Sequence, residues 1–181
     1  MNKQDRPSLK MLLLYAPLGM PLAFGALPVY LLIPHLYATD FGMSLSLLGV
    51  ILLAVRLLDA VQDPLIGLWS DRWAEQHRGR RLLILLGIPG MILGFYLLFN
   101  PLAGMIWLSL SLSLIVFYIF FSVSSVNYQA LGAELSHDYN GRTWLTTSRE
   151  AGALIGVLLA AALPHLLMKH FGRHHGMEIF A

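Results

Sequence analysis

The sequence predicts an all-α membrane protein with five transmembrane helices and the start of a sixth. Two observations carry this prediction. Of the 181 residues, 57% are hydrophobic and 12% are charged, and the mean hydropathy is +0.67, whereas about a quarter of the residues in a soluble domain are charged. The apolar residues also gather in long runs, and a transmembrane helix needs about 20 such residues. An ordinary soluble enzyme, a disordered chain and a fibrous protein are therefore excluded.

The spans follow one another with short connections and no linker. The apolar runs cover residues 11–34, 44–68, 82–99, 105–131 and 143–167, and a further run begins at 177–181. We therefore expect a short cytoplasmic N-terminal segment, residues 1–10, followed by one membrane domain over residues 11–181. The first run is a retained helix and not a signal peptide, because it is too long and four more spans follow it.

The first span is rich in residues that interrupt helices. It contains Pro17, Pro21, Pro28 and Pro34, and a proline inside a helix removes one backbone hydrogen bond and bends the helix. Two interpretations stay open. The bent helix either lines a pathway as a moving element or is a kinked helix that only packs against its neighbours.

Basic residues mark one side of the membrane. They precede the first span and lie between the second and third spans and between the fourth and fifth, whereas the segments around Asp40 and Asn100 hold none. The positive-inside rule makes this side cytoplasmic. We therefore expect a multi-pass protein of a bacterial inner membrane with its N-terminus in the cytoplasm. Lys169 and Arg173, after the fifth span, depart from the rule.

The second span carries three ionisable residues. Arg56, Asp59 and Asp63 are spaced i, i+3 and i+7, which places them within about 60° of one another on a helix. Charged groups inside a membrane helix are costly and often functional. Two carboxylates one turn apart suit a hard cation or a proton, and Pro64 frees a backbone carbonyl beside them. Alternatively, Arg56 only neutralises the two acids.

The fourth span is polar along one face, where Tyr118, Ser122, Ser125 and Gln129 follow one another at helical spacing. For the two serines, a polar cavity and a helix–helix contact are equally favoured. Tyr118 and Gln129 are bulkier, and we expect them to line a polar cavity.

In the fifth span, Arg149 either clamps an anionic or hydroxylated substrate or pairs with an acid on a neighbouring helix. Asp63, Ser125 and Arg149 each lie about six residues, roughly 9 Å, from the cytoplasmic end of their spans. This shared depth is where transporters place solute and ion sites.

The segment between the second and third spans predicts a cytoplasmic latch. Gly67 allows close helix approach, Asp71 and Arg72 lie at the end of one helix, and Arg80 and Arg81 begin the next. Such a turn holds two helices together and releases them when the protein changes state.

This segment resembles the signature loop of the major facilitator superfamily. The run from Arg56 to Gly67 (Arg-x-x-Asp-Ala-x-x-Asp-Pro-x-x-Gly) is similar to the glycoside–pentoside–hexuronide:cation symporter family, typified by melibiose permease. Supporting runs are Tyr37 to Gly42, and Tyr128 through Glu134 to Glu150. The resemblance covers most of the chain, from about Tyr15 to Pro164.

The resemblance implies roles for several of these residues. Asp59 and Asp63 would bind the coupling cation, and Arg149 would match the family's sugar-site arginine. Ser125 stands where the family has a further acid, and Gln129 stands where it has an aromatic sugar platform. The sugar-binding acid of the first helix has no counterpart, so the cation half of the site is better supported than the sugar half.

The sequence therefore predicts the N-terminal part of a cation-coupled secondary transporter that works by alternating access. Its partners would be the lipid bilayer and a small polar solute such as a glycoside, and its only cofactor would be the coupling ion, Na⁺ or H⁺. The family has two six-helix halves, so a C-terminal half or a second copy would complete the pathway. An enzyme and a nucleic-acid-binding protein are not expected, nor is a metal site at the histidines of residues 165–175. The alternative is a truncated, non-transporting membrane scaffold or assembly partner.

Overall fold

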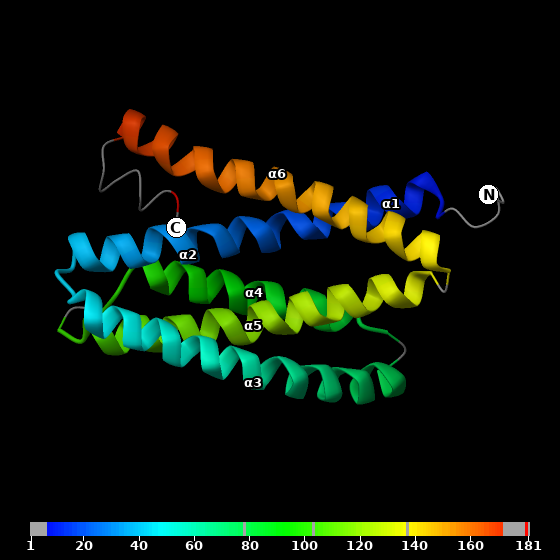
Figure 1. Ribbon diagram of the computed structural model, residues 1–181, viewed down its shortest axis with the longest axis horizontal. Helices are drawn as coiled ribbons and strands as arrows, with labels where there is room; N and C mark the ends of the chain where they lie inside the picture. Colours follow the sequence, from blue (N-terminus) through cyan, green and yellow to red (C-terminus); the bar gives the residue numbers. More distant parts are fainter. Residues whose placement is uncertain (1–6, 78, 103, 137, 172–179, 181) are drawn as a thin grey trace.

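The computed structural model describes residues 7–77, 79–102, 104–136, 138–171 and 180, and in this part of the chain the regular structure is entirely helical (Figure 1). The elements are α1 (Leu9–Tyr15), η2 (Ala16–Leu18), α2 (Gly19–Thr39), α3 (Leu45–His77), α4 (Arg81–Phe99), α5 (Ile106–Leu135) and α6 (Tyr139–Phe171). With α1, η2 and α2 forming one span, five helices are long and apolar enough to cross a membrane. The predicted fold class is confirmed.

Both ends of the chain fall largely outside the described residues. At the N-terminus this concerns most of the predicted segment 1–10. At the C-terminus it concerns most of the predicted sixth run, 177–181, and the second half of the histidine-rich segment 165–175. Phe180 is described, and its buried ring packs near those of Phe24, Phe95 and Phe99, with centroids 5.7, 5.9 and 5.7 Å away.

The first span breaks once along its length. Near Pro17 the chain forms a single 3₁₀ turn, in which the Gly19 N–H bonds to the carbonyls of Ala16 and Pro17. The later Pro28 and Pro34 lie inside the continuous helix α2. The expected interruption is therefore local, and it lies in the shorter part of the span that precedes α2.

The second span ends later than the sequence prediction. Helix α3 runs to His77, so the helix continues past the predicted end of the apolar run at residue 68, and Asp71 and Arg72 lie in its last turns, at the helix end where they were expected. The segment from 69 to 77 contains neither glycine nor proline, so nothing stops the helix before Gly79. That glycine has φ +145°, a conformation that residues with a Cβ rarely adopt. Arg80 then caps α4 and Arg81 begins it, as predicted.

The helices pack as a bundle in which α4 contacts mainly α5, α2 contacts mainly α6, and α3 contacts mainly α5. Buried apolar side chains of α2, α3, α4 and α5 form the core, and the Tyr37 hydroxyl donates to the carbonyl of Leu98 at 3.0 Å. Small residues bring α6 close to the first span: a Cβ at Gly152 or Gly156 would overlap the backbone of Ala16 or Met20.

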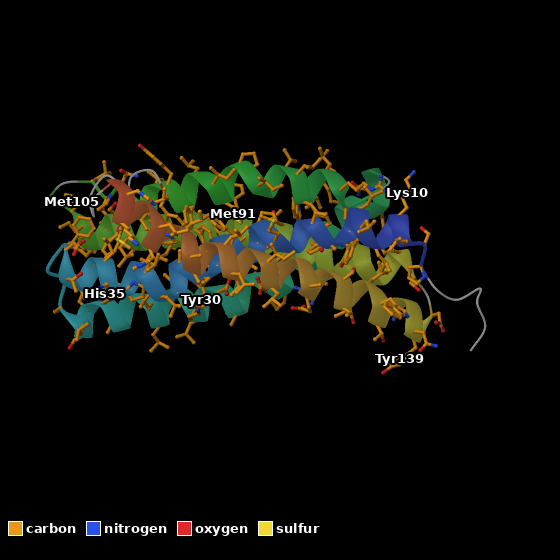
Figure 2. All side chains as sticks on the ribbon, turned by 90° about the horizontal axis from the view of Figure 1, so that it is seen from above. Lys10, Tyr30, His35, Met91, Met105 and Tyr139 are labelled. Atoms are coloured by element: carbon orange, nitrogen blue, oxygen red, sulfur yellow. The ribbon has the colours of Figure 1, made fainter. Side chains whose placement is uncertain are left out.

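The two ends of the bundle differ in charge. Lys10 and Tyr139 lie at one end, and His35 and Met105 lie at the other (Figure 2). The first end also holds the α3–α4 and α5–α6 connections with Arg80, Arg81 and Arg142.

Candidate functional site

A polar cluster joins α3 to α5 inside the apolar bundle. Arg56 Nη1 lies 3.2 Å from Asp59 Oδ2. The other carboxylate oxygen, Asp59 Oδ1, accepts hydrogen bonds from Gln62 Nε2 at 3.2 Å and from Ser122 Oγ at 3.3 Å. Asp59 is largely shielded, with 18% of its side chain exposed. The carboxylate is thus held by neighbours from two helices.

The second carboxylate of this cluster is less well satisfied. Oδ1 of Asp63 is buried and has no hydrogen-bond partner among the described residues. A buried polar atom without a partner costs free energy, and a carboxylate meets this cost by taking a proton or a cation. Together with Asp59 and the Ser122 hydroxyl, Asp63 offers the oxygen ligands that a hard cation prefers. The residues therefore fit a Na⁺ or H⁺ site.

The hydroxyl beside Asp59 belongs to Ser122, whereas the sequence interpretation placed Ser125 among the cation ligands. The two serines are three residues apart, so they point about 60° apart around α5. This rotation turns Ser122 towards α3 and leaves Ser125 on the side that faces α2 and α6. Ser122 belonged to the polar face of the fourth span, but spacing alone could not separate its role from that of Ser125.

Tyr118 also points towards α3 and does not line the predicted solute path. Its hydroxyl accepts a hydrogen bond from Arg56 Nη2 at 2.8 Å, and the side chain is buried. The Arg56 guanidinium lies over two aromatic rings, 4.2 Å from the centroid of Tyr30 and 4.6 Å from that of Tyr118. The guanidinium is therefore held from α2 and α5 as well as by Asp59 on its own helix.

A separate cavity of about 200 Å³ lies between α2, α5 and α6, and most of its lining is apolar. Ser125, Gln129 and Arg149 supply most of its polar lining, and Gln129 Nε2 donates to Ser125 Oγ at 3.2 Å. A second cavity of about 270 Å³ shares Gln129 and Arg149 and adds Arg142 and Thr146. Two predicted solute-path residues, Gln129 and Arg149, thus line both cavities.

Arg149 pairs within its own helix and not with an acid of a neighbouring helix. Its Nη2 and Nε lie 2.7 and 3.2 Å from Oε1 of Glu150, the next residue of α6. The Glu150 side chain is exposed, and Arg149 also lines the cavity of Ser125 and Gln129. The predicted contact of Arg149 with a solute stays a prediction.

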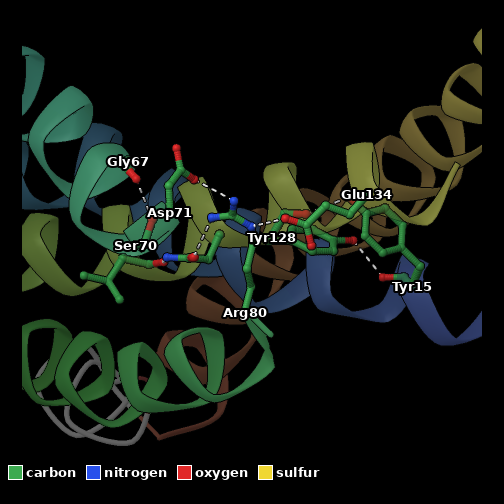
Figure 3. Close-up of polar contacts among 9 residues, drawn as sticks. Tyr15, Gly67, Ser70, Asp71, Arg80, Tyr128 and Glu134 are labelled. Carbon is green, nitrogen blue, oxygen red and sulfur yellow. Dashed lines mark hydrogen bonds and ion pairs between the residues drawn. The ribbon is translucent and has the colours of Figure 1, made fainter. Parts of the chain in front are cut away.

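At the predicted cytoplasmic latch, the structure shows a network centred on Arg80 (Figure 3). Its Nη2 lies 2.6 Å from Asp71 Oδ1, and its Nε lies 2.6 Å from Glu134 Oε1. A weaker bond joins Nη1 to Asn127 Oδ1 at 3.4 Å. Burial alone would lower the pKa of Arg80, but the hydrogen bonds to Glu134 and Asp71 outweigh it and raise the pKa above its ordinary value. Arg80 therefore stays charged and ties α3 to α5.

The composition of the latch differs from the prediction. Arg72 and Arg81 form no ion pair in the part of the chain that the structure describes. A Cβ at Gly67 would lie 3.9 Å from Val126 Cγ1, an ordinary contact, so close approach does not require glycine there. Glu134 completes the latch, and the sequence interpretation did not assign it this role, although it lies near the end of α5 beside a basic connection.

The same end of the bundle contains a reciprocal tyrosine pair (Figure 3). The Tyr15 hydroxyl donates to the Tyr128 carbonyl at 3.0 Å, and the Tyr128 hydroxyl donates to the Tyr15 carbonyl at 2.7 Å. Tyr15 directly precedes the 3₁₀ turn, and its ring centroid lies 4.5 Å from that of Tyr128. The pair therefore fixes the break of the first span against α5.

Comparison with known proteins identifies the family of this chain. The family described as MFS/sugar transport protein matches residues 13–181. The chain belongs to this family. The match includes every span and both polar regions, so the resemblance carried by the run from Arg56 to Gly67 to glycoside–pentoside–hexuronide:cation symporters is confirmed. The members of this family are transporters and not enzymes.

Curated relatives of this transporter family support the assignment. An uncharacterized symporter of Synechocystis is 33% identical over 85% of the chain and 31% of its own length. The inner membrane symporter YicJ of Escherichia coli is 26% identical over 77% of the chain and 32% of its own length. YagG of E. coli, provisionally named a glycoside/cation symporter, is 38% identical over 39% of the chain and 15% of its own length.

The Synechocystis symporter and YicJ match most of the chain. The chain covers only 31% and 32% of these two relatives, about a third of their length. No solved structure matches it significantly. The multi-pass membrane architecture and the symporter family are therefore shown, whereas the roles of individual site residues follow from the geometry above.

Proposed function

We propose that this chain forms the N-terminal part of a cation-coupled symporter for a hydroxylated solute such as a glycoside. The observation that carries the proposal is the cluster of Asp59, Asp63 and Ser122 between apolar helices, with Asp63 Oδ1 buried and without a partner in the described structure. Ionisable groups at this depth are costly unless they serve binding or transport. One Na⁺ or H⁺ at the two carboxylates would satisfy the free oxygen.

The solute would bind at the cavity of Ser125, Gln129 and Arg149. Hydroxyl, amide and guanidinium groups suit the hydroxyls of a sugar, and the name of one relative, a glycoside/cation symporter, agrees with this class. The cavity is open on one side, so a C-terminal half or a second copy would supply the opposite wall. Both sites use α5, which gives cation and solute a shared structural element.

Arg80 would act in alternating access. Its pairs with Asp71 and Glu134 hold the ends of α3 and α5 together. This end of the bundle is rich in basic residues, so we place it on the cytoplasmic side of an inner membrane. Breaking these pairs would open that side, and forming them would close it. Binding of cation and solute would shift the population between the two states.

Uptake by cells or vesicles that carry the full-length protein tests this proposal. Labelled glycosides are offered under an imposed Na⁺ or H⁺ gradient, and Asp59→Asn and Asp63→Asn are compared with the wild type. We expect each variant to lose gradient-driven uptake while it still inserts in the membrane. Gln76→Ala, at an exposed end of α3, serves as the control. Undiminished, gradient-dependent uptake by the double variant would refute the cation site and favour a scaffold role.

A further inference from the structure

Arg56 has more partners than neutralisation of one acid requires. Besides Asp59, it contacts the rings of Tyr30 and Tyr118 and the Tyr118 hydroxyl. Three of these four contacts come from helices α2 and α5. The guanidinium therefore stays in place when Asp59 turns to another ligand, because a cation–π contact with two rings and a hydrogen bond still hold it.

The charge of the cluster follows from this geometry. Two carboxylates, Asp59 and Asp63, and one fixed guanidinium, Arg56, leave one net negative charge when the site is empty. Gln62 and Ser122, the other polar groups at Asp59, are neutral. One monovalent cation brings the cluster to neutrality, whereas a divalent cation leaves a net positive charge within a membrane-spanning helix. An uncompensated charge in such surroundings is strongly unfavourable.

We infer that Arg56 is a built-in counter-charge, fixed by the aromatic clamp of Tyr30 and Tyr118, which restricts the cation site to one monovalent cation. The inference rests on the proposed cation site. In this role Arg56 does not ligate the ion. It sets the valence that the two carboxylates accept, and the clamp prevents it from leaving the site when the ion enters.

The test measures Ca²⁺ binding to the purified full-length protein by equilibrium dialysis, with Na⁺ and H⁺ as competitors. Arg56→Gln keeps much of the volume and removes the charge, so we expect Ca²⁺ to bind at least about tenfold more tightly than to the wild type. Adding Asp59→Asn to Arg56→Gln restores one net negative charge, and we expect the gain to disappear. Arg56→Lys keeps the charge and should bind Ca²⁺ as weakly as the wild type.

The clamp is tested separately with variants that keep or remove a ring. Tyr30→Phe keeps the ring and should leave Ca²⁺ affinity unchanged. Tyr118→Leu removes both ring and hydroxyl, so Arg56 is released and Ca²⁺ affinity should rise towards that of Arg56→Gln. These variants keep the test decisive if Arg56→Gln fails to yield a monodisperse protein. Lys10→Gln removes a cationic residue at the far end of the first span and controls for net charge.

Two results would overturn the inference. One is an unchanged Ca²⁺ affinity in a folded Arg56→Gln protein, and the other is a gain that persists when Asp59→Asn is added. Failure of the proposed function looks different. In that case the Asp59→Asn and Asp63→Asn variants keep gradient-driven solute uptake, whatever their Ca²⁺ affinity.

Discussion

Replacing Arg80 by Gln should open the end of the bundle that we propose to be cytoplasmic. The change removes two charge-assisted contacts of 2.6 Å, to Asp71 and to Glu134. Such bonds are stronger than neutral ones, but both acids are about half-exposed, so water solvates them once Arg80 is gone. We therefore estimate about 1 kcal/mol per contact, or about 2 kcal/mol in all, which shifts the closed–open equilibrium roughly 30-fold.

The absence of cysteine from the chain makes the assay simple. Ser70 is fully buried near the latch, and its hydroxyl bonds to the Gly67 carbonyl at 3.0 Å. In Ser70→Cys protein, a membrane-impermeant maleimide added from the cytoplasmic side reports opening of that end alone. We expect labelling to accelerate when Arg80→Gln is added. The matched control is Arg81→Gln, because this neighbouring arginine has no ion-pair partner in the described structure.

The comparison of the two arginines decides the outcome. Equal labelling rates in the two variants would show that the Arg80 network does not hold this end closed, and the reasoning from its two short contacts would be refuted. Removing the charge of Asp71 alone or of Glu134 alone should reproduce part of the rate increase seen in Arg80→Gln. That result would support a shared network, because each acid supplies one of the two contacts.

Two further predictions concern packing. Gly152→Ala should destabilise the protein by about 1–3 kcal/mol, because the new Cβ overlaps the Ala16 carbonyl. Gly49→Ala, where a Cβ meets nothing within 4 Å, should leave the stability unchanged. Thermal unfolding in detergent measures both variants, and equal stability would contradict the close approach of α6 to the first span. Tyr128→Phe should cost about 1 kcal/mol, because it removes the 2.7 Å bond to the Tyr15 carbonyl, and unchanged unfolding would show that this pair adds no stability.

Much of the fold could be predicted because membrane spans are encoded in local composition. Five apolar runs predict five spans, and Gly79 with Arg80 and Arg81 marks the start of α4. The end of α3 could not be placed, because the residues between 69 and 77 are polar yet compatible with a helix. Polarity there indicates exit from the membrane and says nothing about where the helix ends.

The candidate site could be predicted only as far as spacing along one helix reaches. The stripe of Arg56, Asp59 and Asp63 follows from helical periodicity. The partners of these residues depend on how α5 is rotated against α3, which no local pattern specifies. Ser122, and not the predicted Ser125, therefore lies beside Asp59, and the Tyr118 hydroxyl bonds to Arg56, away from the cavity of Gln129 and Arg149.

Helix α5 connects the polar regions of this protein. Tyr118 and Ser122 contact the charged residues of α3, whereas Ser125 and Gln129 line the cavity between α2, α5 and α6. Further along, Glu134 reaches Arg80. Because α5 is one continuous helix of 30 residues, a shift that improved cation ligation at Ser122 in the proposed symporter would also move the cavity wall and the Arg80 network. Coupling between the proposed cation and solute would then need no direct contact between them, only two discrete positions of α5 that each ligand stabilises differently.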